Sequence, residues 1–318
     1  STAGMTATEA ADLITGPPGS VVEMEVRHEF TGELLTVRLK RSKVQIHSIK
    51  GFVRKPDGNW DYLIDPVHRI GYIRITGFFE NTAPELDGVF RPLYAQGIRG
   101  LILDLRGNPG GLLEAAVQVA DRFISKGTIV STRSRYAEAV TTAKPNNTYP
   151  YVPVVVLVNQ YTASAAEILS GALKDHGRAT VVGVRTFGKG SVQNVIQLDK
   201  GLGAIKLTVA YYYLPSGRNI HRRKNAKTWG VDPNVVVEIS HDELLKITEA
   251  RNQADILYGP TSSEAAETGT TKPGERRCVP IDPQLARAIQ ILIDQASTSQ
   301  PESQPATTRT SPSDHERN

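Results

Sequence analysis

Apolar residues recur along the chain in two patterns that predict different kinds of strand. In residues 21–27 and 34–39 they alternate with polar residues around a Thr31-Gly32 turn, which is typical of a hairpin with one buried face. In residues 100–105 and 153–158 they are almost continuous, as in strands that are covered on both faces. Segments with helical spacing alternate with these continuous strands. We therefore expect an α/β fold with a parallel sheet between helices.

The predicted elements divide the chain into four parts. Residues 1–48 hold a short helix and the hairpin, 49–240 the α/β core, 241–295 a helical extension, and 296–318 a Ser-, Thr-, Pro- and Gln-rich tail that we expect to be disordered. A further strand is expected at 69–75, and helices at 8–15, 81–96, 110–123, 163–174, 242–253 and 282–293. Because the first part is too small for a core and the chain begins at Ser1 without a signal peptide, we expect a processed or shortened protein.

Composition narrows the class of protein. The 318 residues are 39% hydrophobic and 22% charged, which suits a globular protein. The longest apolar run, 152–158, is far shorter than the ~20 residues of a membrane-spanning helix. The net charge is +4, but the Lys and Arg residues are interspersed with acidic residues along most of the chain. The basic cluster at 221–224 lacks interleaved aromatic residues. We therefore expect no nucleic-acid partner. The single Cys278 cannot form an internal disulfide and has no candidate base beside it. No cofactor or metal is expected.

Candidate chemistry lies in two turns that follow the continuous strands. The segment NQYTASAAEI (159–168) leads into a helix near Ser164, whose hydroxyl would lie beside helix amides that stabilise an oxyanion. A serine at a helix start is more often an N-cap, so Ser164 alone is ambiguous. The turn RGNPGG (106–111) has paired glycines whose N–H groups can approach a ligand. In a parallel sheet both turns lie at the carboxyl ends of the strands, where sites of α/β folds gather.

A third turn, TFGKGSVQ (186–193), contains Lys189 between two glycines. The run that starts at Gly183 has the glycine spacing of a phosphate-binding loop. However, Gly190 stands where that motif requires Ser or Thr, and no clear helix follows, so we do not expect nucleotide binding. We expect Lys189 to be buried beside apolar residues. Burial lowers the proton affinity of an amine, which would let Lys189 act as a general base for a serine.

Together these motifs resemble the carboxy-terminal processing proteases, also called tail-specific proteases, which are Ser/Lys peptidases of the S41 type. The shared segments are TASAAEI (162–168), KDHGRA (174–179), TFGKGSVQ, RGNPGG and YLPSGRNI (213–220), and the resemblance extends over about residues 6–240. It implies a ClpP/crotonase-like parallel-sheet protease core preceded by a partial PDZ-like, β-rich segment. The segment GVDPN (230–234) departs from the family, which more often carries Pro-Asp in this loop.

The resemblance implies roles for four side chains. Ser164 would be the nucleophile, and Lys189, 25 residues later, the general base that takes its proton. Gln193 would orient the Lys189 amine. Asp175 matches an acid that the family counts with Ser and Lys as a relay residue, although its position alone would make it a helix-end residue.

The oxyanion donors and the partners are also implied by the resemblance. Gly110 or Gly111, with the amide of Ala165, would hold the tetrahedral oxyanion. Substrates would be polypeptides with apolar C-termini, cleaved near that end, and a PDZ module would bind such a tail as an added strand. The first strands of that module would precede Ser1, so we expect tail recognition here to be incomplete. Because family members are commonly exported, a periplasmic or membrane-associated bacterial protein is implied, with any membrane attachment through the absent N-terminus. The oligomeric state stays open.

Other classes of protein were weighed against this one. A Ser-His-Asp hydrolase would need a histidine near Ser164, but His176 lies twelve residues further on, about 18 Å along the same helix. A crotonase-like acyl-CoA enzyme would share the architecture without requiring Ser164 and Lys189 together. The alternative to an active endopeptidase is a non-catalytic module that binds peptide tails on an inactive protease core.

Overall fold

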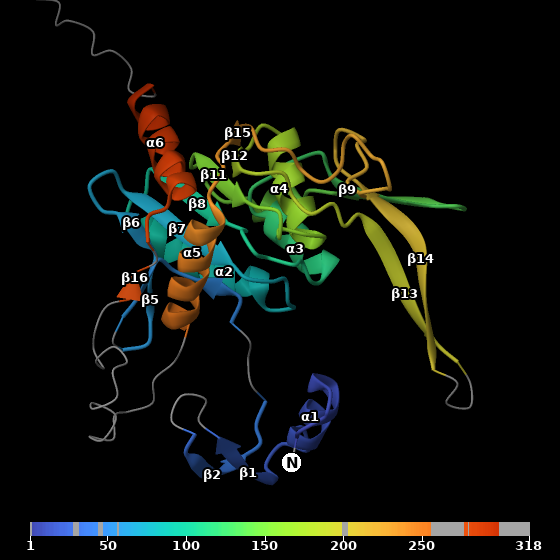
Figure 1. Ribbon diagram of the computed structural model, residues 1–318. Helices are drawn as coiled ribbons and strands as arrows, with labels where there is room; N and C mark the ends of the chain where they lie inside the picture. Colours follow the sequence, from blue (N-terminus) through green and yellow to red (C-terminus); the bar gives the residue numbers. More distant parts are fainter. Residues whose placement is uncertain are drawn as a thin grey trace, which may run out of the picture. The chain divides into compact units, whose positions relative to one another are not determined.

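The computed structural model describes residues 2–27, 32–43, 47–55, 57–198, 203–255, 277–278 and 280–298 (Figure 1). The chain divides into two units, Ser1–Ile46 and His47–Asn318. The first unit contains helix α1 (Ala7–Ile14) and an antiparallel hairpin of β1 (Val21–Arg27) and β2 (Leu34–Lys40). The predicted helix and hairpin are therefore confirmed.

The hairpin differs from the prediction in its burial. Val22, Met24 and Val37 are only half-buried, and Leu34 and Leu35 are exposed. Within the described residues of this unit, only the short helix α1 is available to cover the strands, so the expected buried face does not form. Assignment of this segment to a partial PDZ domain stays a prediction.

The second unit is built on a central sheet in which four successive pairs of strands are parallel. Its order is β15-β12-β11-β8-β7-β3, with β6 also paired to β7; β3 and β6 run antiparallel to β7. The strands are β3 (Ile49–Lys50), β6 (Leu63–Asp65), β7 (Ile70–Ile75), β8 (Gly100–Asp104), β11 (Val154–Val158), β12 (Thr180–Gly183) and β15 (Val235–Val236). The mixed α/β class with a parallel sheet is confirmed.

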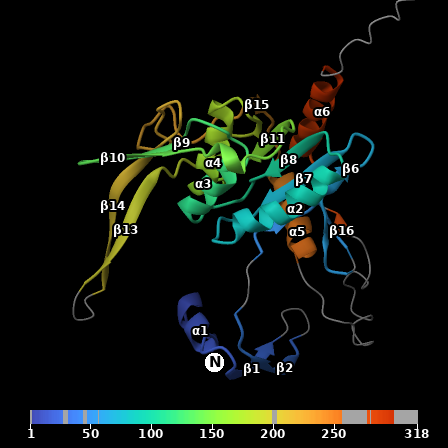
Figure 2. The ribbon, with the colours of Figure 1, turned by 180° about the vertical axis from the view of Figure 1, so that it is seen from behind.

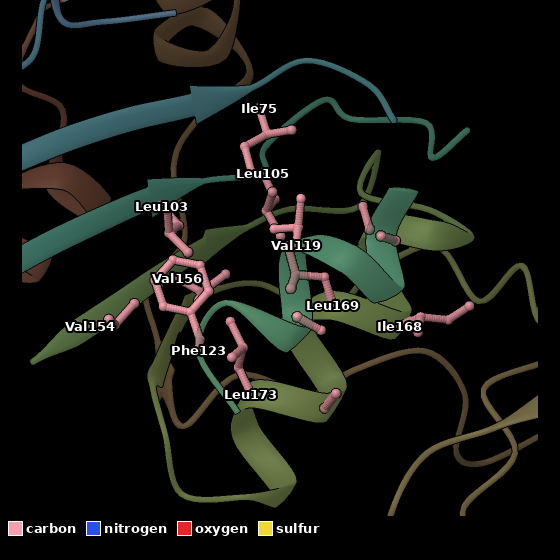
Figure 3. Packing of buried hydrophobic residues seen from close by; sticks show 14 of the residues in the cluster. Ile75, Leu103, Leu105, Val119, Phe123, Val154, Val156, Ile168, Leu169 and Leu173 are labelled. Carbon is pink, nitrogen blue, oxygen red and sulfur yellow. The ribbon is translucent and has the colours of Figure 1, made fainter. Parts of the chain in front are cut away.

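Helices pack on both faces of this sheet because successive residues of each strand point to opposite sides. Leu101 and Leu103 of β8 belong to one hydrophobic cluster, and Ile102 between them belongs to another. The first cluster includes side chains of α2 (Thr82–Ala95), α3 (Leu113–Asp121) and α4 (Ala165–Asp175). Figure 3 shows the part of it between the sheet, α3 and α4, where Val119 and Leu169 are labelled. The second includes side chains of α6 (Pro283–Thr298). The continuous apolar strands are thus explained by burial on two sides.

A second, antiparallel sheet lies beside the core and was not predicted. Its order is β10-β9-β14-β13, and the β13–β14 hairpin projects away from the central sheet (Figures 1 and 2). Apolar residues of this hairpin, including Val195, Ile205 and Leu207, are exposed. Because these residues do not pack in the core, the hairpin lacks the buried face on which strand prediction from sequence depends. The strands are β9 (Thr128–Ser134), β10 (Glu138–Thr142), β13 (Ser191–Gln197) and β14 (Ala204–Tyr213).

The remaining elements are short or C-terminal. Strands β4 (Val53–Arg54), β5 (Trp60–Asp61) and β16 (Arg277–Cys278) form a small sheet, and η1 (Pro145–Asn147) is a 3-10 turn. Helix α5 (His241–Asp255) follows the core as predicted. Helix α6 continues through residues 296–298, which we had placed in the disordered tail, whereas the rest of that predicted tail lies outside the described residues.

The described residues contain neither a candidate membrane span nor a candidate metal cluster. None of the helices there has the length and apolar character that crossing a membrane requires. No cluster of three or more His, Cys, Asp or Glu side chains in the same part of the chain is arranged to hold a metal ion.

We expect α6 to contribute strongly to stability through Leu292, which is buried against Gly100 of β8. Leu292→Ala should lower the free energy of unfolding by about 2–5 kcal/mol, because the lost apolar contacts leave a cavity. Urea denaturation measures this change. Ile281→Ala is the control, since Ile281 is 58% exposed, and it should change stability by no more than about 0.5 kcal/mol. Equal effects of the two substitutions would contradict docking of α6 on the sheet.

Candidate active site

Three turns meet at one edge of the central sheet because they follow neighbouring parallel strands. Residues 105–111 follow β8, residues 159–164 follow β11, and residues 184–190 follow β12. Strands β8, β11 and β12 are adjacent in the sheet and run in the same direction, so their carboxyl ends lie together. The two turns predicted to share an edge do so, and the Lys189 turn joins them.

Ser164 occupies a strained position at the start of α4. Its φ of 56° and ψ of −119° lie in a region that non-glycine residues rarely adopt, at a cost of order 1–3 kcal/mol. The surrounding contacts hold it there, since its N–H donates to Glu167 Oε2 at 2.8 Å. A sharp turn of this kind leaves the half-exposed Ser164 side chain at the N-terminus of the helix, where the dipole favours negative charge.

Side-chain amides hold the first two turns together. Asn108 Oδ1 accepts from Gly110 N–H at 2.8 Å, and the Asn108 carbonyl accepts from Ala163 N–H at 2.9 Å. On the other side, Asn159 Oδ1 accepts from Gly107 N–H at 3.0 Å. Asn108 and Asn159 are both buried, and the bond from Gly110 N–H to Asn108 satisfies a buried backbone donor. The position of the glycine turn relative to Ser164 is thereby fixed.

The close approach of the turns explains the paired glycines. A Cβ on Gly110, whose φ is +102°, would lie 2.8 Å from Ser164 Cβ and 3.0 Å from Ala165 N. Gly111, with φ +140°, lies against Phe78, where a Cβ would meet the Phe78 carbonyl oxygen at 2.2 Å. Both positions therefore require glycine, and α3 begins at Leu113 rather than at residue 110 as predicted. Gly110, Ser164 and Ala165, predicted as site residues, do lie together.

The two glycines differ in what their amides do. Gly110 N–H is already bound to Asn108, whereas the amides of Gly111 and Ala165 have no acceptor within the described residues. The Gly110 carbonyl accepts from Phe78 N–H, and Leu112 N–H donates to the Phe78 carbonyl. The N–H of Gly111, which lies between these two residues, takes no part in the pairing with Phe78. Of the two glycines named from the sequence, Gly111 is thus the one with an amide available for an oxyanion.

Glu167 joins the serine turn to the lysine turn, a role that the sequence analysis missed. The side chain is fully buried in the first turn of α4. Its Oε1 accepts from Thr186 Oγ1 at 2.5 Å and Gly188 N–H at 2.7 Å, and its Oε2 accepts from Ser164 N–H and Lys189 N–H at 2.8 Å each. Burial raises the pKa of Glu167 above its ordinary value, although the four hydrogen bonds oppose that shift.

The shared carboxylate sets the distance between the two turns. The amide nitrogens of Ser164 and Lys189 each lie 2.8 Å from the same Glu167 oxygen, so they are at most twice that distance apart. A further bond from Phe187 N–H to the Thr162 carbonyl, 3.0 Å long, ties the same turns. Ser164 and Lys189 are therefore brought together at the level of the backbone.

The Lys189 side chain contradicts the predicted burial. Lys189 is exposed, and its amine makes no hydrogen bond to the Ser164 hydroxyl. The flanking glycines are the buried part of the turn: a Cβ on Gly188 would lie 2.8 Å from Arg222 Cβ, and one on Gly190 2.6 Å from His221 N. The segment 220–222 thus packs against the backbone of the turn and leaves the lysine side chain in solvent.

Gln193 and Asp175 are not brought to Ser164 in this arrangement. Gln193 is exposed on β13, beside a register shift, and makes no hydrogen bond with Lys189. Asp175 ends α4, about 16 Å from Ser164 along the helix, and accepts from Ser216 N–H at 3.0 Å. His176 follows it and contacts the Thr128 carbonyl, so the structure gives a Ser-His-Asp triad no support.

With this geometry in hand, comparison with known proteins identifies the family. Residues 69–237 match the profile of Peptidase family S41. The chain belongs to peptidase family S41. It is 37% identical over 241 residues to a carboxy-terminal-processing protease of Bartonella bacilliformis, covering 74% of this chain and 51% of the relative. A carboxyl-terminal-processing protease of Synechocystis sp. is 37% identical over 250 residues, covering 79% of this chain and 54% of the relative.

Structural comparison agrees with the S41 assignment. A solved photosystem II D1 C-terminal processing protease superposes with a TM-score of 0.52 at 34% identity, over 74% of this chain and 60% of that protein. The resemblance inferred from the three turns is confirmed at the level of the family. The chain spans about half the length of the curated relatives it matches.

The residues that sequence reasoning missed are those that act through distant contacts. Glu167, Asn108 and Asn159 each lie within or beside a motif that was singled out, but no local pattern assigns them a partner. For Glu167 a signal was available, because an acid three residues after a helix-starting serine is the pattern of a capping box. That pattern predicts the bond to Ser164 N–H but not the bonds to the lysine turn.

We expect Glu167→Gln to loosen both turns at once. In the variant an NH2 group replaces one carboxylate oxygen and would face the N–H donors that now bond to that oxygen. Those hydrogen bonds would be lost, which should lower the free energy of unfolding by about 1–3 kcal/mol. Thermal unfolding measures the loss, and amide hydrogen exchange should rise at residues 186–190. Glu114→Gln is the matched control, because Glu114 also lies in the first turn of a helix but is exposed. Unchanged exchange in Glu167→Gln would contradict this role.

Proposed function

We propose that the protein is a serine endopeptidase that cleaves polypeptides near their C-terminus, with Ser164 as nucleophile and Lys189 as general base. The observation that carries the proposal is the Glu167 carboxylate, which holds the backbones of Ser164 and Lys189 side by side. Membership of peptidase family S41 supports the reaction class. The pair of free amides beside Ser164 supports acyl transfer in particular.

The proposed reaction uses groups of this chain alone. Neutral Lys189 takes the proton of the Ser164 hydroxyl as Oγ forms a bond to the scissile carbonyl carbon. The resulting oxyanion accepts hydrogen bonds from the amides of Gly111 and Ala165. The carbon–nitrogen bond then breaks, and the protonated amine of Lys189 returns its proton to the leaving nitrogen. Water, deprotonated by the same lysine, releases the acyl group from Ser164 and regenerates the hydroxyl.

For this reaction the Lys189 side chain has to turn from solvent toward Ser164. The turn backbone is fixed by Glu167 and by the packing of Gly188 and Gly190, so rotation about the side-chain bonds suffices. A bound polypeptide would exclude water from the Lys189 side chain, which is exposed in the free protein. Gln193, on the strand that follows, would orient the amine in that state. Asp175 would act at a distance, by holding the turn at Ser216.

Substrate class and organisation follow from the family resemblance. We propose polypeptides with apolar C-termini as substrates, bound in part by the β1–β2 segment as part of a PDZ-like domain. In this scheme residues 1–48 form that segment, 49–240 the protease core, 241–295 a helical extension and 296–318 a tail. An exported, periplasmic or membrane-associated location fits the same family.

The decisive experiment replaces the two proposed catalytic side chains separately. Ser164→Ala and Lys189→Ala should each reduce cleavage of an unfolded polypeptide with an apolar C-terminus by roughly 10⁴-fold or more, because the nucleophile and base act as a unit. Lys206→Ala, an exposed lysine of β14, is the control and should cleave at the unaltered rate. Cleavage that survives either catalytic substitution would refute the dyad, and binding of labelled tails without any cleavage would favour a non-catalytic binding module.

A second experiment tests the oxyanion turn. In Gly110→Ala the new Cβ would collide with Ser164 Cβ, so we expect cleavage to fall by about 10²-fold or more. Gly107→Ala is the matched control, because Gly107 lies in the same turn and has a positive φ of +76°, yet a Cβ there meets no atom within 4 Å. Rates of both variants are compared at equal folded fraction. Equal losses would mean that backbone strain, rather than the contact with Ser164, limits the reaction.

A further inference from the structure

A buried group of charges joins the glycine turn to the C-terminal helices. It comprises two carboxylates, Asp104 and Asp282, and two guanidinium groups, Arg106 and Arg251, all of which are at most 9% exposed. Asp104 ends β8, and Arg106 directly precedes the turn at 107–111. Arg251 belongs to α5, and Asp282 directly precedes α6. Charges of opposite sign are thus paired in a region that water does not reach.

Arg106 is held by acceptors from two distant parts of the chain. Its Nη2 donates to Asp104 Oδ2 at 2.8 Å, and its Nη1 donates to Asp282 Oδ1 at 2.8 Å and to Gln284 Oε1 at 3.0 Å. Asp282 Oδ1 also accepts the amides of Gln284 and Leu285 at the start of α6, so its position is set by that helix. The guanidinium is a rigid fork, and fixing both of its branches fixes the side chain.

Arg251 completes the group from α5. Its Nη2 is hydrogen-bonded to Asp104 Oδ2, and its Nη1 lies 3.4 Å from the carbonyl oxygen of Arg106. Burial alone would raise the pKa of Asp104, but Arg106 and Arg251 outweigh it and hold that pKa well below its ordinary value. Asp255, four residues later on α5, pairs with Arg74 of β7, which anchors the same helix to the sheet.

The position of these contacts gives them a consequence for the turn. The amide of Gly107, next to Arg106, is bound to Asn159, and three residues later Gly110 lies against Ser164. Displacement of the Arg106 backbone would therefore move the amide of Gly111 relative to Ser164. Arg251 and Asp282 lie beyond residue 237, where the match to family S41 ends. The C-terminal helices thus reach the edge of the sheet that carries the candidate site.

We propose that Asp282 and Arg251 are positioning residues for the oxyanion turn: they hold Arg106, and Arg106 sets the placement of the Gly111 amide beside Ser164. This role rests on the proposed peptidase function. Neither residue touches the substrate. Loss of Asp282 leaves the buried Arg106 guanidinium short of a carboxylate partner, so the turn that follows Arg106 relaxes to a different position.

The test compares Asp282→Asn with a matched substitution, Asp87→Asn. Asp87 also pairs with an arginine, Arg122, but between α2 and the end of α3, and it makes no contact with the glycine turn. Asp282→Asn should lower kcat by about 10- to 100-fold with KM changed by less than about threefold, because oxyanion contacts strengthen in the transition state. The affinity of a peptide aldehyde, which forms a tetrahedral adduct with Ser164, should fall by the same factor. Asp87→Asn should leave kcat and aldehyde affinity unchanged.

Asp282→Glu, which restores a carboxylate, should recover kcat to within about threefold of the original protein. If Asp282→Asn does not fold, Gln284→Ala removes one acceptor of Arg106 without removing a charge, and should show the same kcat-selective loss at about three- to tenfold. A fall in kcat that Asp87→Asn reproduces, or a rise in KM alone, would overturn the proposal.

A measurement without turnover separates this proposal from the proposed function. Amide hydrogen exchange at Gly107, Asn108 and Gly110, whose N–H groups are hydrogen-bonded, should accelerate about tenfold in Asp282→Asn and stay unchanged in Asp87→Asn. If the original protein cleaves nothing, the peptidase function fails while accelerated exchange still supports the coupling. Unchanged exchange in folded Asp282→Asn overturns the coupling whether or not the protein is a peptidase.

Discussion

The edge of the parallel sheet brings the backbone polar groups of three turns close together, and those that are buried need partners. Adjacent strands β8, β11 and β12 end there, so three turns crowd together. Buried side chains meet the need: Asn108 and Asn159 bond to the first two turns, and Glu167 bonds to the second and third. The same bonds that satisfy the backbone also fix the distances among the turns. Satisfying the backbone and building the site are thus one structural problem.

How much of this arrangement the sequence could predict depends on the range of the contacts. Continuous apolar strands and helical spacing predicted the parallel sheet and its helices, because those patterns record local burial. Ser164 and the turn at 106–111 were found since each follows a strand directly. Glu167 bonds to residues 19 to 22 positions away, and Arg106 to Asp282 at a separation of 176. No pattern along the chain specifies such pairs, and they become visible only once the strands are placed side by side.

The error over Lys189 has a different origin. A lysine between glycines and near apolar residues was expected to be buried, but in this turn the glycines themselves make the close contacts. Gly188 and Gly190 press against the segment 220–222, which fixes the backbone and turns the side chain outward. The apolar neighbours Val181 and Val182 belong to β12 and are buried in the core rather than around the amine. Sequence proximity to apolar residues therefore did not predict the environment of the side chain.

The two halves of the candidate site are consequently prepared to different degrees. On the side proposed to hold the oxyanion, the turn backbones are held by Asn108, Glu167 and the close contact of Gly110. The Lys189 side has a fixed backbone, but its side chain lies in solvent and makes no hydrogen bond to the Ser164 hydroxyl. A bound chain that excludes water would change the surroundings of the Lys189 side chain and leave the backbone of both turns in place. Under the proposed mechanism this arrangement would tie the reactivity of Ser164 to a polypeptide bound over Lys189, because the serine would lack its base until the Lys189 side chain turns toward it.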